Sequence, residues 1–147
     1  MKKLLFCNFF ILTCFAVNSQ SASDSVKTVV NTLFTAMKKA DGPLLKSCFS
    51  DNAVLQTITD NKGTVKNEAV QDFVNSISKL PAGDADERIV FDIVKIDETL
   101  AIVWAPYQFF YKGIFSHCGV DSFQLVRING QWKIQYLVDT RRKSSCL

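Results

Sequence analysis

The sequence is poor in metal-binding side chains. It has one histidine, His117, and its five cysteines are scattered at positions 7, 14, 48, 118 and 146. Zinc sites are built from His and Cys ligands at short, regular spacings, and no such spacing occurs here. We therefore expect no metal site, and we expect the protein to work without a cofactor.

The chain also lacks an excess of charge of one sign. It carries 17 Lys and Arg against 14 Asp and Glu, and Lys2 and Lys3 lie in an N-terminal segment that we expect to be removed. The remaining net charge is then +1, with 15 basic and 14 acidic side chains. Nucleic-acid-binding domains present clustered basic residues, so no nucleic-acid partner is expected.

The N-terminus has the features of a secretory signal peptide. A basic start, Met1-Lys2-Lys3, precedes the apolar run LLFCNFFILTCFAV, and small residues at Val17 and Ser19 suit cleavage after Ser19. The run is short for a transmembrane helix, although an uncleaved anchor is the alternative. We predict a signal peptide over residues 1–19 and one domain over 20–147, exported to the periplasm or the medium and free of the membrane after cleavage.

Hydrophobic periodicity predicts helices in the first half of the chain. Apolar residues spaced at i, i+3, i+4 and i+7 between 26 and 37 indicate an amphipathic helix capped by Ser23 or Asp24. Residues 41–43 end it and begin a short helix through 49, and 54–58 favour a strand. We expect a third helix over residues 69–80, capped by Asn67.

The second half changes period. Four β-rich runs, at residues 88–97, 100–112, 114–128 and 131–140, are separated by short turns. Strands joined in this way pair antiparallel, and helices gathered before them cover one face. The predicted fold class is α+β, as a single domain without repeats or linkers.

The turn sequences predict a register for the last three strands. A two-residue turn at Asn129-Gly130 places Phe123 opposite Tyr136, and one at Lys112-Gly113 places Trp104 opposite Asp121 and Gln108 opposite His117. In this register one face is apolar, with Leu100, Ile102, Trp104, Phe123, Leu125, Ile134, Tyr136 and Val138. Asp121 then lies beside Trp104, with His117 roughly 13 Å away on the same face.

The other face would carry Tyr107, Phe109 and Tyr111, which are a candidate dimer interface. A bulge at Pro106 would instead shift the alternation and bring some of these aromatic rings into the pocket. Both arrangements are open at this stage.

The cysteines that remain after cleavage suggest one disulfide. Cys118 should point away from His117, because neighbouring residues in a strand diverge, so a Cys–His nucleophile pair is not expected. Cys118 and Cys146 are the candidate pair, provided that the tail folds back along the sheet. Cys48 is expected to be buried as a small apolar residue.

The segments VVNTLFTAMKKADGPLLKSCFSDNAVLQT and NGQWKIQYLVDT resemble the nuclear transport factor 2-like superfamily, and suggest an exported bacterial member of its SnoaL-like or ketosteroid isomerase-like branches. The resemblance implies a cone of three N-terminal helices on a strongly curved, mixed or antiparallel sheet, a pocket between them, and pairing as a homodimer. In the isomerase pattern Thr57 and Leu33 stand where the general-base aspartate and the oxyanion-binding tyrosine are found, so isomerase chemistry does not carry over. Asp121 lies where the cyclases place an acid/base aspartate.

These observations lead to three functional hypotheses. The first is an exported protein that binds a small apolar or ring-containing molecule. Its predicted ligand-binding residues are Phe34, Met37, Trp104, Gln108, His117, Asp121 and Tyr136. The second is a cofactor-independent isomerase, cyclase or dehydratase with Asp121 as the catalytic acid or base. The third is a structural or partner-binding dimeric domain, in which Asp121 and His117 only make hydrogen bonds within the fold and have no functional role.

Overall fold

A computed structural model of the chain describes residues 21–59 and 62–146. The elements begin with three helices and two strands: α1 (Ala22–Lys39), α2 (Gly42–Ser47), β1 (Phe49–Ile58), β2 (Val65–Glu68) and α3 (Val70–Ser78). Five strands follow: β3 (Ala85–Ile89), β4 (Ile93–Asp97), β5 (Leu100–Tyr111), β6 (Ile114–Ile128) and β7 (Gln131–Thr140). The predicted signal peptide lies outside the described residues. Within them, no helix is both long and apolar enough to cross a membrane.

The helices begin and end at local capping signals. The Ser21 side chain accepts a hydrogen bond from the Asp24 amide, so α1 starts earlier than the predicted caps Ser23 and Asp24. Asp41 caps α2 in the same way through the Leu44 amide. The predicted capping role of Asn67 is wrong, because Val65–Glu68 pairs with β1 as an edge strand and α3 begins after Ala69.

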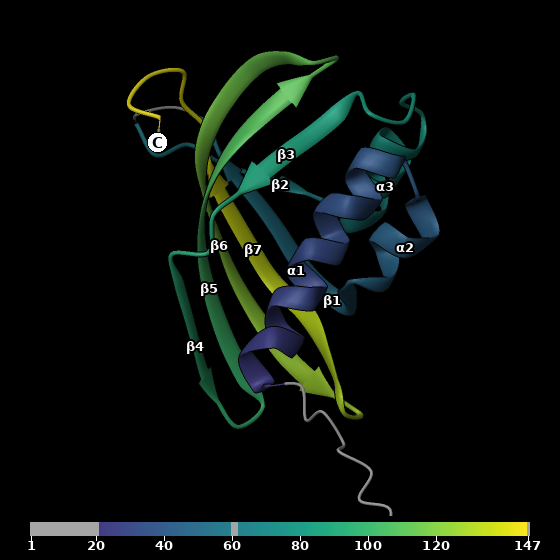
Figure 1. Ribbon diagram of the computed structural model, residues 1–147, viewed down its shortest axis with the longest axis vertical. Helices are drawn as coiled ribbons and strands as arrows, with labels where there is room; N and C mark the ends of the chain where they lie inside the picture. The colour runs from purple at the N-terminus through teal and green to yellow at the C-terminus, as the bar shows by residue number, and fades with distance from the viewer. Residues whose placement is uncertain (1–20, 60–61, 147) are drawn as a thin grey trace, which may run out of the picture.

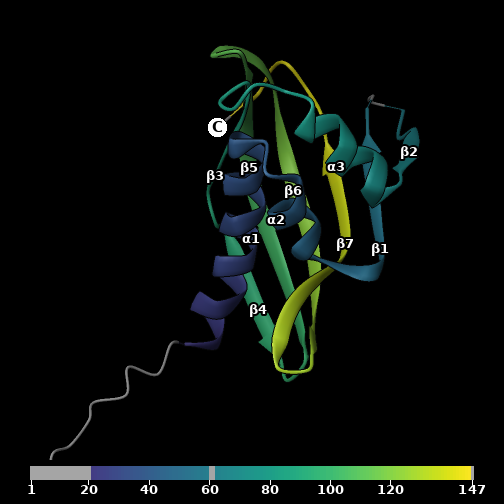
Figure 2. The same ribbon diagram turned by 90° about the vertical axis from the view of Figure 1, so that its right-hand side faces the viewer.

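The seven strands form one curved, open sheet in the order β2-β1-β7-β6-β5-β3, with β4 also paired to β5 (Figure 1). All neighbouring strands are antiparallel except β1 and β7, which run parallel. The predicted strand at 88–97 is two strands, because β3 pairs with the second half of β5 and β4 with its first half. The view turned by 90° shows α1, α2 and α3 over the same face of the sheet (Figure 2). The predicted α+β fold class is confirmed.

Two β-bulges set which side chains face the helices. Both predicted turns are present, but Ser116 is an extra residue in β6 opposite β5, and Gln135 is an extra residue in β7 opposite β6. Beyond each bulge the pairing is shifted by one residue, which moves every later side chain to the other face. Asp121 therefore pairs with Ala105 and Asp139, and not with Trp104 and Val138 as predicted.

The core lies between the helices and the inner face of the sheet. Phe123, Leu125 and Ile134 are fully buried, as predicted, and the Phe34 ring meets Phe123 edge to face with centroids 6.2 Å apart. The predicted inward positions of Leu100, Ile102 and Trp104 are wrong. These side chains are on the outer face and are 42–46% exposed, whereas Ala101, Val103 and Ala105 point inward.

Candidate functional site

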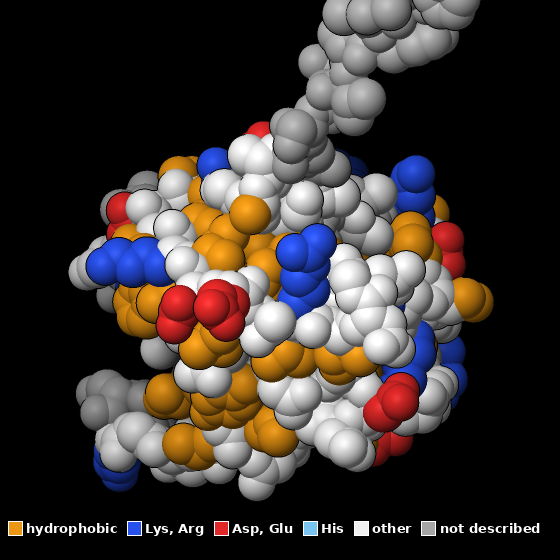
Figure 3. All heavy atoms as spheres, turned by 90° about the horizontal axis from the view of Figure 1, so that it is seen from below, with side chains coloured by type: hydrophobic (Ala, Val, Ile, Leu, Met, Phe, Trp, Pro, Cys, Tyr) orange, Lys and Arg blue, Asp and Glu red, His pale blue; other side chains and the backbone are white. Residues whose placement is uncertain are grey.

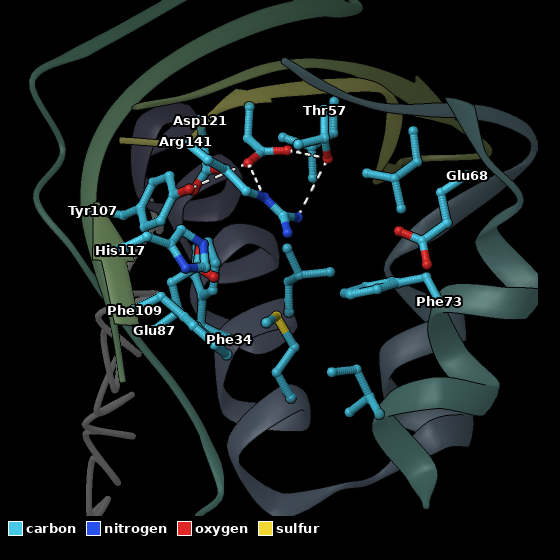
Figure 4. Close-up of a pocket in the computed structure, with 16 residues that line it drawn as sticks. Phe34, Thr57, Glu68, Phe73, Glu87, Tyr107, Phe109, His117, Asp121 and Arg141 are labelled. Carbon is cyan, nitrogen blue, oxygen red and sulfur yellow. Dashed lines mark hydrogen bonds and ion pairs between the residues drawn. The ribbon is translucent and has the colours of Figure 1, made fainter. Parts of the chain in front are cut away.

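A cavity of about 230 Å³ opens between the helices and the inner face of the sheet (Figure 4). Its apolar walls come from α1, α3 and the sheet. They are formed by Leu33, Phe34, Met37, Leu55, Phe73, Ile77, Phe109 and Leu137. Its polar groups are Thr57, Glu68, Glu87, Tyr107, His117, Asp121, Asp139 and Arg141.

A row of polar residues crosses the inner face where three strands are in register. Thr57 of β1 pairs with Asp139 of β7, which pairs in turn with Asp121 of β6. All three side chains are buried, at 7% exposure or less. Most of the polar groups are thus placed by strand pairing, which fixes their relative positions.

Asp139 is held by donors from three directions. The Thr57 hydroxyl donates to Asp139 Oδ1 at 2.6 Å, and the Tyr107 hydroxyl lies 3.2 Å from Oδ2. The Arg141 guanidinium donates through Nε to the same Oδ2 at 3.0 Å and through a terminal nitrogen to Thr57 Oγ1 at 3.3 Å. A buried carboxylate needs hydrogen-bond donors of this kind. Asp139 therefore has a structural role, and it keeps the Arg141 side chain at the cavity.

Gly119 allows β6 to lie close to the end of β7 beside the cavity. A Cβ at this position would overlap the Thr140 carbonyl oxygen and crowd the Tyr107 ring. The same carbonyl accepts a hydrogen bond from the Tyr107 hydroxyl at 2.9 Å. The close approach therefore positions the end of β7 and, with it, the Arg141 side chain.

Glu87 and Asp121 form a different kind of pair. Both carboxyl groups line the cavity and influence each other's protonation, because two neighbouring ionised carboxylates repel each other and can only accept hydrogen bonds. Burial raises the pKa of Glu87 to about 7, and burial together with the charges of Glu87 and Asp139 raises the pKa of Asp121 well above its usual value. Glu87 is half-buried and lines the cavity from β3.

His117 is packed between aromatic rings at the same wall. Its ring centroid lies 5.0 Å from that of Phe109 and 5.7 Å from that of Tyr107, and its Nδ1 is 3.0 Å from the Ser116 hydroxyl. Burial, reinforced by the positive charge of Arg141, lowers the pKa of His117. The imidazole is therefore mainly neutral at pH 7.

The structure brings four of the seven predicted ligand-binding residues to the cavity. Phe34, Met37, His117 and Asp121 line it, as do Leu33 and Thr57, the two positions singled out by the superfamily resemblance.

The other three predicted residues are elsewhere. Trp104 is on the outer face, Gln108 is paired with Cys118, and Tyr136 lies on the outer side with its hydroxyl donating to Gln56. Their misplacement follows from the bulges at Ser116 and Gln135. For the same reason Tyr107 and Phe109 face the cavity, so their predicted place in an outer dimer interface is wrong.

Sequence reasoning missed several polar groups of the cavity. Glu87 directly precedes the run predicted as a strand at 88–97, and Arg141 directly follows the run predicted at 131–140. Leu137, Asp139 and, just beyond the end of β7, Arg141 are spaced two residues apart, which is the signal that a correct register would have revealed.

The C-terminal tail is tied to β6 by the disulfide Cys118–Cys146, with the two Cα atoms 5.8 Å apart. Two backbone hydrogen bonds between Cys118 and Arg142, at 2.8 and 2.9 Å, hold the tail beside the strand. Cys48 is a buried free thiol, and burial raises its pKa to about 11.

Comparison with known proteins agrees with this architecture. Residues 21–136 match the model of a family described as "Putative lumazine-binding". The chain belongs to this lumazine-binding-like family. Among the described residues, no group of three or more His, Cys, Asp or Glu side chains is arranged to hold a metal ion.

Solved structures similar to this family member share its fold. A nuclear transport factor 2-like protein of unknown function from Shewanella baltica is 18% identical, with a TM-score of 0.64 over 82% of this chain and 93% of that one. A similar protein from Methylobacillus flagellatus is 20% identical, with a TM-score of 0.63 over 81% and 90%. A Nostoc punctiforme domain with a cystatin-like fold is 16% identical, with a TM-score of 0.66 over 86% and 82%.

No curated protein sequence matches the chain. At these identities the solved structures establish the fold alone. The chain thus has the fold of nuclear transport factor 2-like proteins and belongs to the family described as "Putative lumazine-binding".

Proposed function

We propose that the protein is exported and binds one small ring-containing molecule in the cavity between its helices and its sheet. The observation that carries this proposal is an apolar chamber with its hydrogen-bonding groups concentrated on the sheet side, as in most small-molecule sites (Figure 4). The lumazine-binding-like family membership supports a ring compound as the ligand. The Cys118–Cys146 disulfide supports an oxidising compartment outside the cytosol.

The cavity volume limits the size of the ligand. Pockets for drug-sized molecules are about 300–1,000 Å³, whereas an engineered cavity of about 150 Å³ accepts benzene. The 230 Å³ cavity falls between these values. It therefore suits one ring or a compact fused pair of rings, with Phe34 and Phe73 providing aromatic walls.

Native mass spectrometry of the mature protein, purified from an exported fraction, tests this proposal. We expect the protein to retain a small molecule, or to take up added single-ring compounds. Its intact mass should match a chain that begins near residue 20. Ile77→Phe adds volume inside the cavity and should abolish binding, whereas Leu80→Phe, just beyond the same helix and outside the lining, should not. Equal uptake by wild type and Ile77→Phe would contradict binding in this cavity.

The Glu87–Asp121 pair favours a second candidate function, a cofactor-independent isomerase, cyclase or dehydratase. A carboxyl group with a pKa near neutrality can both donate and accept a proton at pH 7. Once a converted ligand is known, Asp121→Asn should bind it and fail to turn it over. Unchanged turnover would remove Asp121 from the catalytic role.

Pairing of two copies also stays a prediction, with a different surface from the one first expected. The outer face exposes Ile102, Trp104 and Ile93, and the end of the molecule at which α1 begins shows patches of hydrophobic side chains among charges of both signs (Figure 3). If copies pair through the outer face, Trp104→Glu should convert a dimer to a monomer in sedimentation velocity. If the wild-type protein is a monomer, the hypothesis of a structural, dimeric domain is excluded.

A further inference from the structure

The Glu87–Asp121 pair is short of hydrogen-bond donors. Asp121 is only 3% exposed, and its Oδ2 atom is buried and accepts no hydrogen bond from an N–H or hydroxyl group of the described residues. The neighbouring group that most affects Asp121 is the carboxyl group of Glu87, itself an acid, which lines the same cavity. Buried carboxyl groups are normally satisfied by basic or amide donors, so this pair is unusual for a purely structural role.

The other polar groups of the cavity do not supply the missing donors. Arg141 is engaged by Asp139 and Thr57, and the Tyr107 hydroxyl by Asp139 and the Thr140 carbonyl. The charged and titratable groups that face the pair or share its cavity are Asp139, Arg141, Tyr107, His117 and Glu68. Four carboxyl groups thus share the cavity with a single guanidinium, and the imidazole is mainly neutral. The cavity as a whole favours positive charge and N–H donors.

Resting on the function proposed above, we propose that the bound molecule is a small flat ring that presents a cationic or N–H-rich nitrogen edge, of the amidine or 2-aminopyrimidine type, to Glu87 and Asp121. Carboxylates accept two parallel N–H bonds from such edges, as they do from guanidinium groups. Glu87 and His117 lie on one side of the cavity and Phe73 on the other, with the Arg141 guanidinium above (Figure 4). A ring between Phe34 and Phe73 can therefore direct its nitrogen edge toward the pair.

Binding of such a cation is coupled to release of a proton. The pair is doubly protonated and uncharged at low pH, and it must lose a proton to solvent before it can pair with an amidinium, which itself stays protonated over this range. Since the pKa of Glu87 is about 7, binding should tighten by about 25-fold between pH 5.5 and pH 7.5. A neutral ring of the same size should show no such dependence.

Isothermal titration of the mature protein with benzamidine, benzamide and benzoate tests the proposal, because the three probes share a ring and differ in the charge of one substituent. At pH 7.5 we expect benzamidine to bind at least tenfold more tightly than benzamide, and benzoate to bind more weakly than both. The double variant Glu87→Gln/Asp121→Asn should lose at least tenfold in benzamidine affinity and less than threefold in benzamide affinity. Glu98→Gln, at an exposed turn, is the matched control and should change neither.

The possible failures are distinguishable. If none of the probes binds the wild type, both the ring-binding function and the nitrogen-edge inference fail for single-ring molecules. If benzamide or benzoate binds as tightly as benzamidine, the cavity binds rings but the inference is overturned, and equal or tighter benzoate binding would assign recognition to Arg141. The pH dependence of benzamidine binding by the wild type tests the inference even if the double variant does not fold, and a flat profile would overturn it.

Discussion

The buried carboxyl pair should make the stability of the unliganded protein depend on pH. Glu87 has a pKa of about 7 in the folded chain against an ordinary value of 4.5. A raised pKa means that the folded state holds a proton that the unfolded chain has released. The stabilisation is fully present below pH 4.5 and is lost as the pH rises through 7.

The size of this effect follows from the shift. A difference of about 2.5 pKa units corresponds to about 3 kcal/mol, of which about 2 to 3 kcal/mol is lost between pH 5 and pH 8. The raised pKa values of Asp121 and Glu68 act in the same direction, and the lowered pKa of His117 acts in the opposite one. A comparison between variants is therefore needed to isolate the contribution of Glu87.

Urea unfolding at pH 5 and pH 8 provides that comparison. The free energy of unfolding of the wild type should fall by about 2 to 3 kcal/mol more than that of Glu87→Gln over this interval. Glu98→Gln, at an exposed turn, should follow the wild type. If wild type and Glu87→Gln showed the same change, the carboxyl group of Glu87 would not be protonated in the folded cavity, and the reasoning about the pair would be refuted.

Three further predictions concern the frame around the cavity. Cys146→Ser should lower the free energy of unfolding by about 3 kcal/mol, because the disulfide closes a loop with a sequence separation of 28 residues; reductant should weaken the wild type equally, and a loss below about 1 kcal/mol would contradict the estimate. In the mature oxidised chain, Cys48 should resist iodoacetamide at pH 8 until urea unfolds the protein, since its thiol is buried with a pKa of about 11; rapid native labelling in mass spectra would count against this. Gly119→Ala should cost more than about 2 kcal/mol in urea unfolding, because its Cβ would meet the Thr140 carbonyl, and a neutral effect would show that this corner can relax.

The sequence was informative wherever a pattern is local. The apolar spacing of α1, the Asp41-Gly42-Pro43 boundary and the turns at Asn129-Gly130 and Lys112-Gly113 all appear in the structure. Asp121 and His117 were placed on the inner face correctly, and both line the cavity, because buried and less buried residues alternate along β6 from Gly119 to Val126.

The errors arose where one strand was used to place another. Trp104, Gln108 and Tyr136 were assigned to the pocket through pairing with β6, and a single extra residue at Ser116 or Gln135 reverses each assignment. In the sequence alone, nothing about Ser116 or Gln135 shows that it forms a bulge and not a regular strand position. The same shifts hid Tyr107, Asp139 and Arg141, and so concealed the polar groups that surround the carboxyl pair.

Methyl NMR can show whether a small ring enters the cavity between the helices and the sheet. With benzamidine or benzamide present at saturation, we predict intermolecular nuclear Overhauser effects from the ring protons to methyl groups of Met37, Ile77 and Leu137, which line the cavity. Methyl groups of the outer face, such as that of Ile102, should show none. Contacts confined to the outer face, or a bound ring that contacts none of the cavity methyl groups, would contradict the account.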